Sequence, residues 1–346
     1  MIDNEVEAGG AAASGSFGVF TLNYGPAVFS NNIIAAGAGL TGSFGAYSYS
    51  MGPGLETTFV GNEIAGGDAT GNTYGLVQYH GAAHFFDNRL DGGMSTSTST
   101  YGFVFLGEGT PVLDANVAAG GESPTSSYGG VLSFESANPF FLSNNVFDGA
   151  DGTAASFGAA FMHESPGGVI ANNTFLAGAG SASSFGVQFD AYSAAPNPTT
   201  WFINNIVDGG GGTAASIAFV EDSGADFSEL RFYNNNFRAD LGATTGCLLY
   251  DSDATDCLDA IGDVNDGDWY NCGTADGNMT VPHGLANPGA GDYHLTAASA
   301  LIDAGVNPFI LYDGPFSDFF WFDFEQDVRP RGEGWDIGAD EFVPAP

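Results

Sequence analysis

The sequence contains no lysine. Its 346 residues carry five basic side chains, all arginine, against 41 acidic ones, and the formal net charge is -36. Binding to nucleic acid requires many cations to replace the counterions around phosphates, so five arginines exclude a nucleic-acid partner. The same imbalance repels an anionic membrane surface. Acidic polysaccharides are disfavoured as well, unless bound metal ions bridge the like charges.

Long apolar runs and a recognisable signal peptide are also lacking. No stretch of about 18 apolar residues is present, so we expect no transmembrane helix. The start, MIDNEVEAGG, has neither a basic region nor an apolar one. We therefore expect the sequence to begin inside a longer secreted protein. Disorder is excluded by the composition, because 44% hydrophobic and 14% aromatic residues can bury a sizeable core.

Cysteine is scarce. The three cysteines, Cys247, Cys257 and Cys272, lie close together near the end of the repetitive part of the chain. This clustering predicts one disulfide, formed by one pair among the three, and one free thiol. A zinc site is disfavoured because no two cysteines have CxxC spacing.

What the chain has in abundance is a repeat. An asparagine recurs at intervals of 26 to 32 residues, usually two positions before an apolar side chain. The series is Asn4, Asn32, Asn62, Asn88, Asn116, Asn145, Asn173, Asn205 and Asn235. An aromatic-glycine pair recurs in phase with it. These pairs begin at Phe17, Phe44, Tyr74, Tyr101, Tyr128, Phe157 and Phe185.

The repeat predicts a parallel β-solenoid. Apolar residues occur in short pieces bounded by Gly, Asn, Ser and Asp, which is typical of strands and turns rather than helices. One repeat has the length of one coil, and stacked coils place equivalent residues above one another at about 4.8 Å. We expect the asparagines to pass amide hydrogen bonds between coils and the aromatic rings to fill the core. The glycine beside each ring would permit close packing.

At this point the chain resembles right-handed parallel β-helix repeat proteins. Its C-terminal part resembles the closing segment of secreted bacterial proteins of the choice-of-anchor type. The matching motifs lie in Gly291–Asn307 (GDYHLTAASALIDAGVN) and Asp323–Phe342 (DFEQDVRPRGEGWDIGADEF). Ala300 stands where the family pattern has proline, and a glycine before Arg329-Pro330 is missing. The resemblance implies the fold and export from the cell but no activity, because the family is mostly of unknown function.

Together these patterns predict an all-β fold. We expect a right-handed parallel β-helix of about nine coils over residues 1–250 and an irregular bridge and C-terminal cap over 251–346. In the cap, Asp323, Asp327 and Asp336 are expected to form ion pairs with Arg329 and Arg331.

Carboxylates follow several of the aromatic strands, where a β-helix places its variable loops. The candidates for acid, base or nucleophile are Glu135, Glu164, Asp190, Glu221 and Asp222. His163 and Tyr192 are candidate ligand-binding residues. Carboxylates on adjacent coils would lie about 5 Å apart, a spacing compatible with glycoside hydrolysis. The simpler interpretation is a solvated acidic rim.

Closely spaced aspartates on glycine turns favour calcium, which prefers oxygen ligands. The candidates are Asp148 with Asp151, and Asp251 with Asp253. Neither pair follows a full calcium-binding motif.

Two functions remain. The first is a non-catalytic extracellular or cell-surface β-helix with a structural, adhesive or self-assembling role, including end-to-end stacking of copies. The second is a carbohydrate-binding or glycoside-hydrolysing β-helix that acts on neutral glycans through the lateral carboxylates. A lyase is disfavoured because such enzymes commonly use a lysine or arginine base, and lysine is absent.

Overall fold

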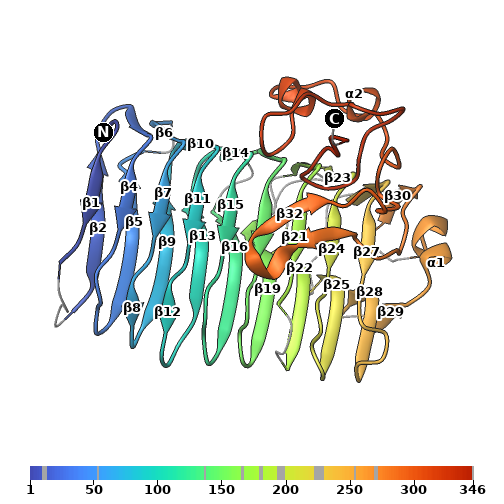
Figure 1. Cartoon of the computed structure of the whole chain (residues 1–346), viewed down its shortest axis with the longest axis horizontal. Helices are drawn as coiled ribbons and strands as arrows, with labels where there is room; N and C mark the ends of the chain where they lie inside the picture. The colour runs from blue at the N-terminus through green and yellow to red at the C-terminus, as the bar shows by residue number, and fades with distance from the viewer. Residues whose placement is uncertain are drawn as a thin grey trace.

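The computed structural model describes residues 1–9, 14–52, 54–135, 138–164, 167–178, 182–192, 199–221, 230–252, 255–268 and 272–344. It is an all-β, right-handed parallel solenoid, as the repeat predicts (Figure 1). Each coil contributes one strand to each of three sheets. We name the sheets by their first strands: sheet 1 starts at β1, sheet 2 at β2 and sheet 3 at β3.

The strands of each sheet follow one another in chain order. Sheet 1 consists of β1 (Glu5–Glu7), β4 (Ile33–Ala35), β7 (Glu63–Ala65), β11 (Arg89–Asp91), β15 (Val117–Ala119), β18 (Val146–Asp148), β21 (Thr174–Leu176), β24 (Ile206–Asp208) and β27 (Asn236–Arg238). Sheet 2 consists of β2 (Ser16–Asn23), β5 (Gly42–Ser50), β9 (Asn72–Tyr79), β13 (Thr100–Gly107), β16 (Ser126–Phe134), β19 (Ala155–Glu164), β22 (Ser183–Tyr192), β25 (Ala215–Glu221), β28 (Thr245–Asp251) and β29 (Asp256–Leu258). Sheet 3 consists of β3 (Ala27–Ser30), β6 (Glu56–Val60), β10 (Ala82–Phe86), β14 (Val112–Asp114), β17 (Phe140–Ser143), β20 (Gly168–Ala171), β23 (Thr200–Ile203), β26 (Leu230–Tyr233) and β30 (Cys272–Asp276). A short pair, β8 (Asp68–Ala69) and β12 (Met94–Ser95), lies between sheets 1 and 2.

The repeated asparagines form a continuous ladder in the turn between sheets 3 and 1. In each step the side-chain Oδ1 of one asparagine accepts two hydrogen bonds from the asparagine of the preceding coil. Asn145, for example, donates its backbone N–H and its Nδ2 to Oδ1 of Asn173, both at 2.9 Å. Its Nδ2 also donates to the carbonyl oxygen of Leu113. The ladder thereby satisfies turn backbone that is buried away from water.

Phenylalanine dominates the interior enclosed by the three sheets. Phe59, Phe85, Phe103 and Phe105 are completely buried, and they belong to one continuous core that runs through successive coils. This core contains side chains from all three sheets, so each coil buries its apolar residues against the coils on either side.

The aromatic rings of the aromatic-glycine pairs lie outside this core, which corrects the expectation that they fill it. The glycine, not the ring, takes the inward position. A Cβ atom on Gly18 would come within 2.7 Å of Cγ2 of Ile34, on sheet 1, and within 2.6 Å of the carbonyl oxygen of Gly45. Because sheets 1 and 2 approach so closely there, only glycine fits, and the preceding ring points to the outer face of sheet 2.

The last coil is closed by a short helix. Helix α1 (Ile261–Asp266) buries Val264 in the solenoid core, and its Asn265 accepts the final ladder bonds from Asn278 at 2.9 and 3.0 Å. Beside it, β29 runs antiparallel to β28, and a disulfide joins Cys247 to Cys257 across the two strands. The predicted disulfide is therefore the pair Cys247–Cys257.

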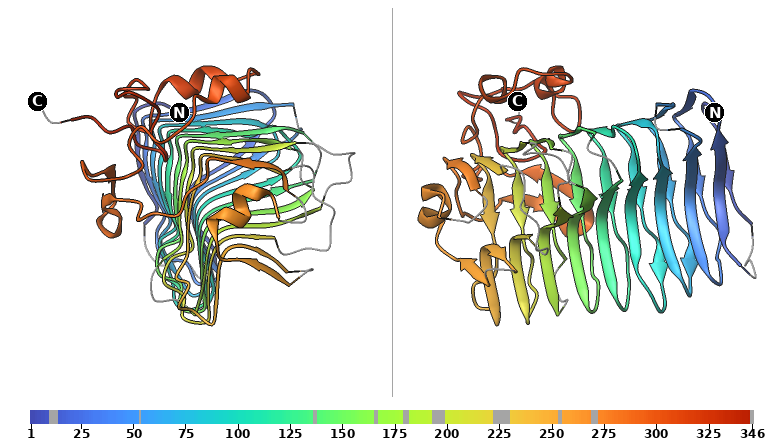
Figure 2. Two further views of the ribbon diagram at one scale, coloured as in Figure 1. Left: turned by 90° about the vertical axis from the view of Figure 1, so that its right-hand side faces the viewer. Right: turned by 180° about the vertical axis from the view of Figure 1, so that it is seen from behind.

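Residues 281–342, which we call the strap, turn back and pack along one side of the solenoid (Figures 1 and 2). The strap contains β31 (Leu285–Asn287), β32 (Asp292–Leu295), α2 (Pro308–Leu311) and the 3-10 helices η1 (Pro288–Ala290) and η2 (Ser317–Trp321). These residues, expected to form a C-terminal cap, cover a flank of the solenoid, whereas α1 covers the end.

Asparagines next to the ladder hold the strap. Nδ2 of Asn144 donates to the carbonyl oxygen of Phe319 at 3.0 Å, and Nδ2 of Asn204 donates to that of Val306 at 2.8 Å. Both asparagines adopt the left-handed conformation, with φ of 55°. That backbone turn directs their side chains outward. The residue that follows each of them, Asn145 or Asn205, forms the hydrogen bonds of the ladder.

Candidate functional site

The outer face of sheet 2 carries a row of stacked aromatic rings that runs along the solenoid. Neighbouring ring centroids in the row are 4.5 to 5.0 Å apart, and the ring planes are within 23° of parallel. The row consists of Phe17, Phe44, Tyr74, Tyr101, Tyr128, Phe157 and Phe185. We call this row, together with the one beside it, the outer aromatic face.

The second row lies three residues further along each strand and is mainly apolar. Its residues are Phe20, Tyr47, Val77, Val104, Val131, Ala160, Gln188, Val220 and Tyr250, matched strand to strand by the sheet register. The rings of the two rows meet edge to face, as in Phe44 and Tyr47 with an interplanar angle of 81°. Val77, Val104 and Val131 are nearly covered by their neighbours and form a second apolar layer outside the main core.

The outer aromatic face carries no carboxylate, ammonium or guanidinium group in either row. Burial raises the pKa of Tyr74, Tyr101 and Tyr128, so their phenols stay neutral. In a chain with a net charge of -36, this is a long uncharged surface. Stacking covers the ring faces and leaves ring edges partly exposed, and the Tyr74 hydroxyl accepts a hydrogen bond from Nδ2 of Asn72 at 3.0 Å. A hollow of about 300 Å³ lies at its far end, lined by residues that include Phe157, Phe185 and Tyr250.

The predicted lateral carboxylates do not form one column. Glu135 is exposed directly after β16, and Asp190 is exposed on β22, where its register partner is Met162. Glu221, in contrast, is buried and lies beside Asp251 on the next coil. For His163, Glu164 and Tyr192 the structure describes the backbone alone, in which Glu164 pairs with Tyr192. Asp222 and Asp253 lie outside the described residues.

A cleft of about 560 Å³ lies on the flank, between the ends of sheet 1 strands and the strap. Asp148, one of the predicted calcium ligands, faces it. Its Oδ2 accepts a hydrogen bond from the Tyr293 hydroxyl at 2.9 Å, and its Oδ1 accepts the Ala150 N–H at 2.9 Å. Burial raises the pKa of the Asp148 carboxyl. Asp151, the other predicted ligand, is exposed and also lines the cleft.

Asp208 lines the same cleft two strands further on. Its Oδ2 lies 2.8 Å from Nη1 of Arg238 and 3.6 Å from Nε2 of His283. Nδ1 of His283 accepts the Leu285 N–H, so the ring carries its hydrogen on Nε2, toward the carboxylate. Burial lowers the pKa of His283. Tyr293 therefore attaches the strap to Asp148 by a hydrogen bond, and His283 lies beside Asp208. All four residues line the cleft.

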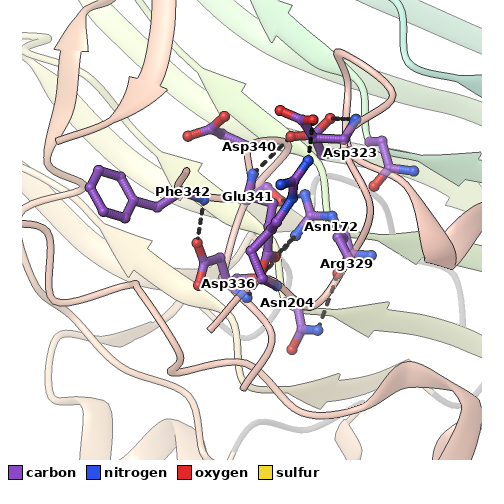
Figure 3. Close-up of polar contacts among 12 residues, drawn as sticks. Asn172, Asn204, Asp323, Arg329, Asp336, Asp340, Glu341 and Phe342 are labelled. Atoms are coloured by element: carbon purple, nitrogen blue, oxygen red, sulfur yellow. Dashed lines mark hydrogen bonds and ion pairs between the residues drawn. The ribbon is translucent and has the colours of Figure 1, made fainter. Parts of the chain in front are cut away.

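The strap itself has a polar centre around Arg329, which is completely buried (Figure 3). Its guanidinium donates to the carbonyl oxygens of Gly338 and Asp336 and lies 3.3 Å from Oε2 of Glu341. Of the expected ion pairs, Arg331 with Asp327 forms at 2.6 Å. The partner of Arg329 is instead Glu341, while Asp323 and Asp336 accept backbone N–H groups.

One cluster of possible metal ligands was not predicted from the sequence. Among the described residues, His294, Glu325 and Asp340 bring one ligand atom each within 4.8 Å of one another. They come from three separate parts of the strap. The signal is present in the motifs that carry the family resemblance, DYHL, DFEQD and DIGADE, but their convergence depends on the path of the strap.

The fold places the chain among parallel β-solenoid proteins. No family model, curated protein or solved structure matches it. None of the described helices has the length and apolar character needed to cross a membrane.

Proposed function

We propose that the protein is a non-catalytic, self-associating β-solenoid that acts outside the cell or at its surface, and that its contact surface is the outer aromatic face. The observation that carries the proposal is the uncharged double row of apolar and aromatic residues on the outside of sheet 2. The resemblance of the C-terminal segment to choice-of-anchor proteins supports export.

The geometry favours a second copy of the chain over a sugar as the partner. Sugars stack on open ring faces, whereas here each interior ring has a neighbour on both faces. A second solenoid offers the same strand spacing, so rows of side chains from two such faces can interdigitate as in packed sheets. Ring edges of one copy can then contact ring faces and apolar groups of the other.

Charge supports the same choice of surface. Two copies that each carry -36 repel one another wherever their carboxylates face. The uncharged face is where they can approach at lowest electrostatic cost. Stacking of another copy on the last coil is less favoured, because α1 and β29 cover that coil, and β29, now the edge strand of sheet 2, is antiparallel and only three residues long.

The test is sedimentation of the whole chain over a range of salt concentrations. We expect self-association to strengthen as salt screens the repulsion, since the screening length falls from about 30 Å at 0.01 M to about 10 Å at 0.1 M ionic strength. Tyr101→Glu places a charge in the middle of the first row. It should weaken association by about tenfold or more, because a desolvated charge in a contact has no partner.

Ile310→Glu is the matched control. It adds the same charge at a more exposed apolar residue, 76% accessible, on the strap. Circular dichroism confirms that each variant is folded. If the wild-type chain stays monomeric at every salt concentration, or if both variants weaken association equally, the proposal fails.

The flank cleft favours a second candidate function, the binding or hydrolysis of a neutral glycan. Asp148, whose pKa is raised by burial, and Asp208, paired with Arg238, line one cleft with Leu176 between them. Two strand steps separate their backbones by roughly 9.5 Å, near the carboxyl separation of about 6.5–9.5 Å in inverting glycosidases. Asp148 would act as the acid and Asp208 as the base.

Asp148→Asn and Asp208→Asn test this second candidate. Each should abolish turnover of a neutral oligosaccharide while leaving the fold intact. Asp240→Asn, at an exposed position that does not line this cleft, should leave turnover unchanged. Unchanged binding and turnover in both cleft variants would exclude the hydrolase.

A further inference from the structure

The cluster of His294, Glu325 and Asp340 lies where three parts of the strap meet. His294 is on β32, Glu325 follows η2, and Asp340 belongs to the terminal DIGADE motif. His294 and Glu325 have half-exposed side chains, whereas Asp340 is buried. The cluster therefore consists of one buried carboxylate, Asp340, and two side chains that solvent can reach.

The imidazole of His294 is held between two carboxylates. Its Nδ1 lies 2.6 Å from Oδ1 of Asp292, and its Nε2 lies 2.7 Å from Oε2 of Glu325. An imidazole that binds a metal through one nitrogen commonly donates its other N–H to a carboxylate, which fixes the ring and strengthens the ligand. Asp292 is positioned to do this, because it contacts Nδ1 while Nε2 is directed at Glu325.

Asp340 supplies a second preformed feature. Its Oδ2 accepts the Leu295 N–H at 2.6 Å, which fixes the carboxylate beside the residue that follows His294. No described residue donates a hydrogen bond to its Oδ1. Asp340 is only 4% exposed, and one of its carboxylate oxygens lies within 4.8 Å of the ligand atoms of His294 and Glu325.

We propose that His294, Glu325 and Asp340 bind a divalent transition-metal cation, with zinc as the best fit, and that Asp292 positions the imidazole. One nitrogen and two carboxylate oxygens match the mixed ligands that zinc accepts, whereas calcium prefers six to eight oxygens. Two ligand atoms of a tetrahedral zinc lie about 3.3 Å apart. Small rotations of the two half-exposed side chains bring the set to that spacing and leave the fourth position to water.

Binding of the metal would connect β32, the turn after η2 and the terminal segment. These three parts of the strap already pack together through an apolar cluster that includes Leu295, Phe324 and Ala339, and the metal would add a second link between them. The site would therefore fasten the strap to itself on the flank of the solenoid, at some distance from the outer aromatic face.

The test is titration of the whole chain with zinc chloride by calorimetry, in 0.15 M salt and excess magnesium to suppress binding to the acidic surface. We expect one saturable site. Cobalt in place of zinc should give the visible absorption of a low-symmetry nitrogen-oxygen site. His294→Gln should remove both signals, and Asp292→Asn should weaken affinity by about 10- to 100-fold.

His84→Gln is the matched control. His84 is also next to a carboxylate, 3.7 Å from Glu56, but lies on the solenoid and has no third ligand among the described residues. It should leave zinc binding unchanged. Absence of saturable binding to the folded wild-type chain overturns the proposal, as does binding that His294→Gln and Glu325→Gln leave intact.

Discussion

The solenoid and the strap are stabilised in opposite ways. In the solenoid the same contact recurs in every coil, so Asn145 does for its coil what Asn116 and Asn173 do for theirs. In the strap most polar contacts are unique. Arg329 is one such case, and the carboxylates of its neighbours Asp336 and Glu341 accept hydrogen bonds from individual backbone N–H groups.

The two regions therefore differ in how many equivalent contacts support each single contact. A repeated contact is supported by equivalent contacts in the coils above and below it. A unique contact has no substitute. We therefore expect the largest effects of single substitutions in the strap, although the solenoid contains most of the chain.

Arg329→Met should produce the largest loss. It leaves the Glu341 carboxylate, 1% exposed, without its cation, and breaking a buried pair in this way costs about 3–5 kcal/mol. Urea denaturation followed by tryptophan fluorescence measures it, since Trp321 and Trp335 both lie in the strap. Adding Glu341→Gln should recover part of the loss. A loss below about 1 kcal/mol would show that the strap does not depend on Arg329.

Asn145→Ala tests the repeated part. The substitution leaves the Leu113 carbonyl and the Asn116 N–H without their partners. One buried group left unsatisfied costs about 1–3 kcal/mol, and we expect a total loss of about 2–3 kcal/mol, below that of Arg329→Met, because equivalent contacts in the flanking coils support this turn. Asn4→Ala, at an exposed position in the first coil, should cost much less. Thermal unfolding of the two variants compares them, and equal losses would contradict a cooperative buried ladder.

The pH dependence of stability should follow Asp114, a solenoid residue that faces the strap. Burial raises the pKa of its carboxyl to about 7, against the hydrogen bonds of Ser143 and Asn144 and the charge of Arg329, which lower it. The unfolded chain releases this proton near pH 4. The folded state therefore binds the extra proton between the two values, so its stabilising effect is complete below about pH 4 and is lost as pH rises through 7.

From pH 5.5 to 7.0 this one group should lower stability by at most about 2 kcal/mol, since one proton corresponds to about 1.4 kcal/mol per pH unit. Asp114→Asn keeps an acceptor oxygen for its neighbours and should flatten the dependence. Denaturation curves at the two pH values measure the change. An unchanged slope in the variant would assign the effect to other carboxyls.

Arg331→Ala should produce the smallest effect. The ion pair with Asp327 is about 40% exposed on both sides and joins residues four apart. Such surface pairs contribute about 0–1 kcal/mol. The same urea experiment measures it, and a loss as large as that of Arg329→Met would remove the distinction between the two arginines.

Much of the solenoid could be predicted because its residues repeat. The asparagine spacing alone places the ladder and the coil boundaries. The direction of the aromatic rings could not be predicted by simple alternation, because both Gly18 and Val19 face inward between the outward Phe17 and Phe20. The side-chain pairings of the strap could not be predicted for another reason. The pairing of Arg329 with Glu341, or of Tyr293 with Asp148, depends on chain path and not on any local pattern.

The ladder also has a consequence for how such a chain can change in length. Each asparagine of the ladder donates to the next coil, each one after Asn4 accepts from the previous coil, and α1 supplies Asn265 as a terminal acceptor. An additional coil inserted between any two existing ones would find a donor on one side and an acceptor on the other. Duplication or loss of a whole repeat therefore preserves every bond of the ladder, which makes the length of the solenoid a property that gene duplication can alter one coil at a time.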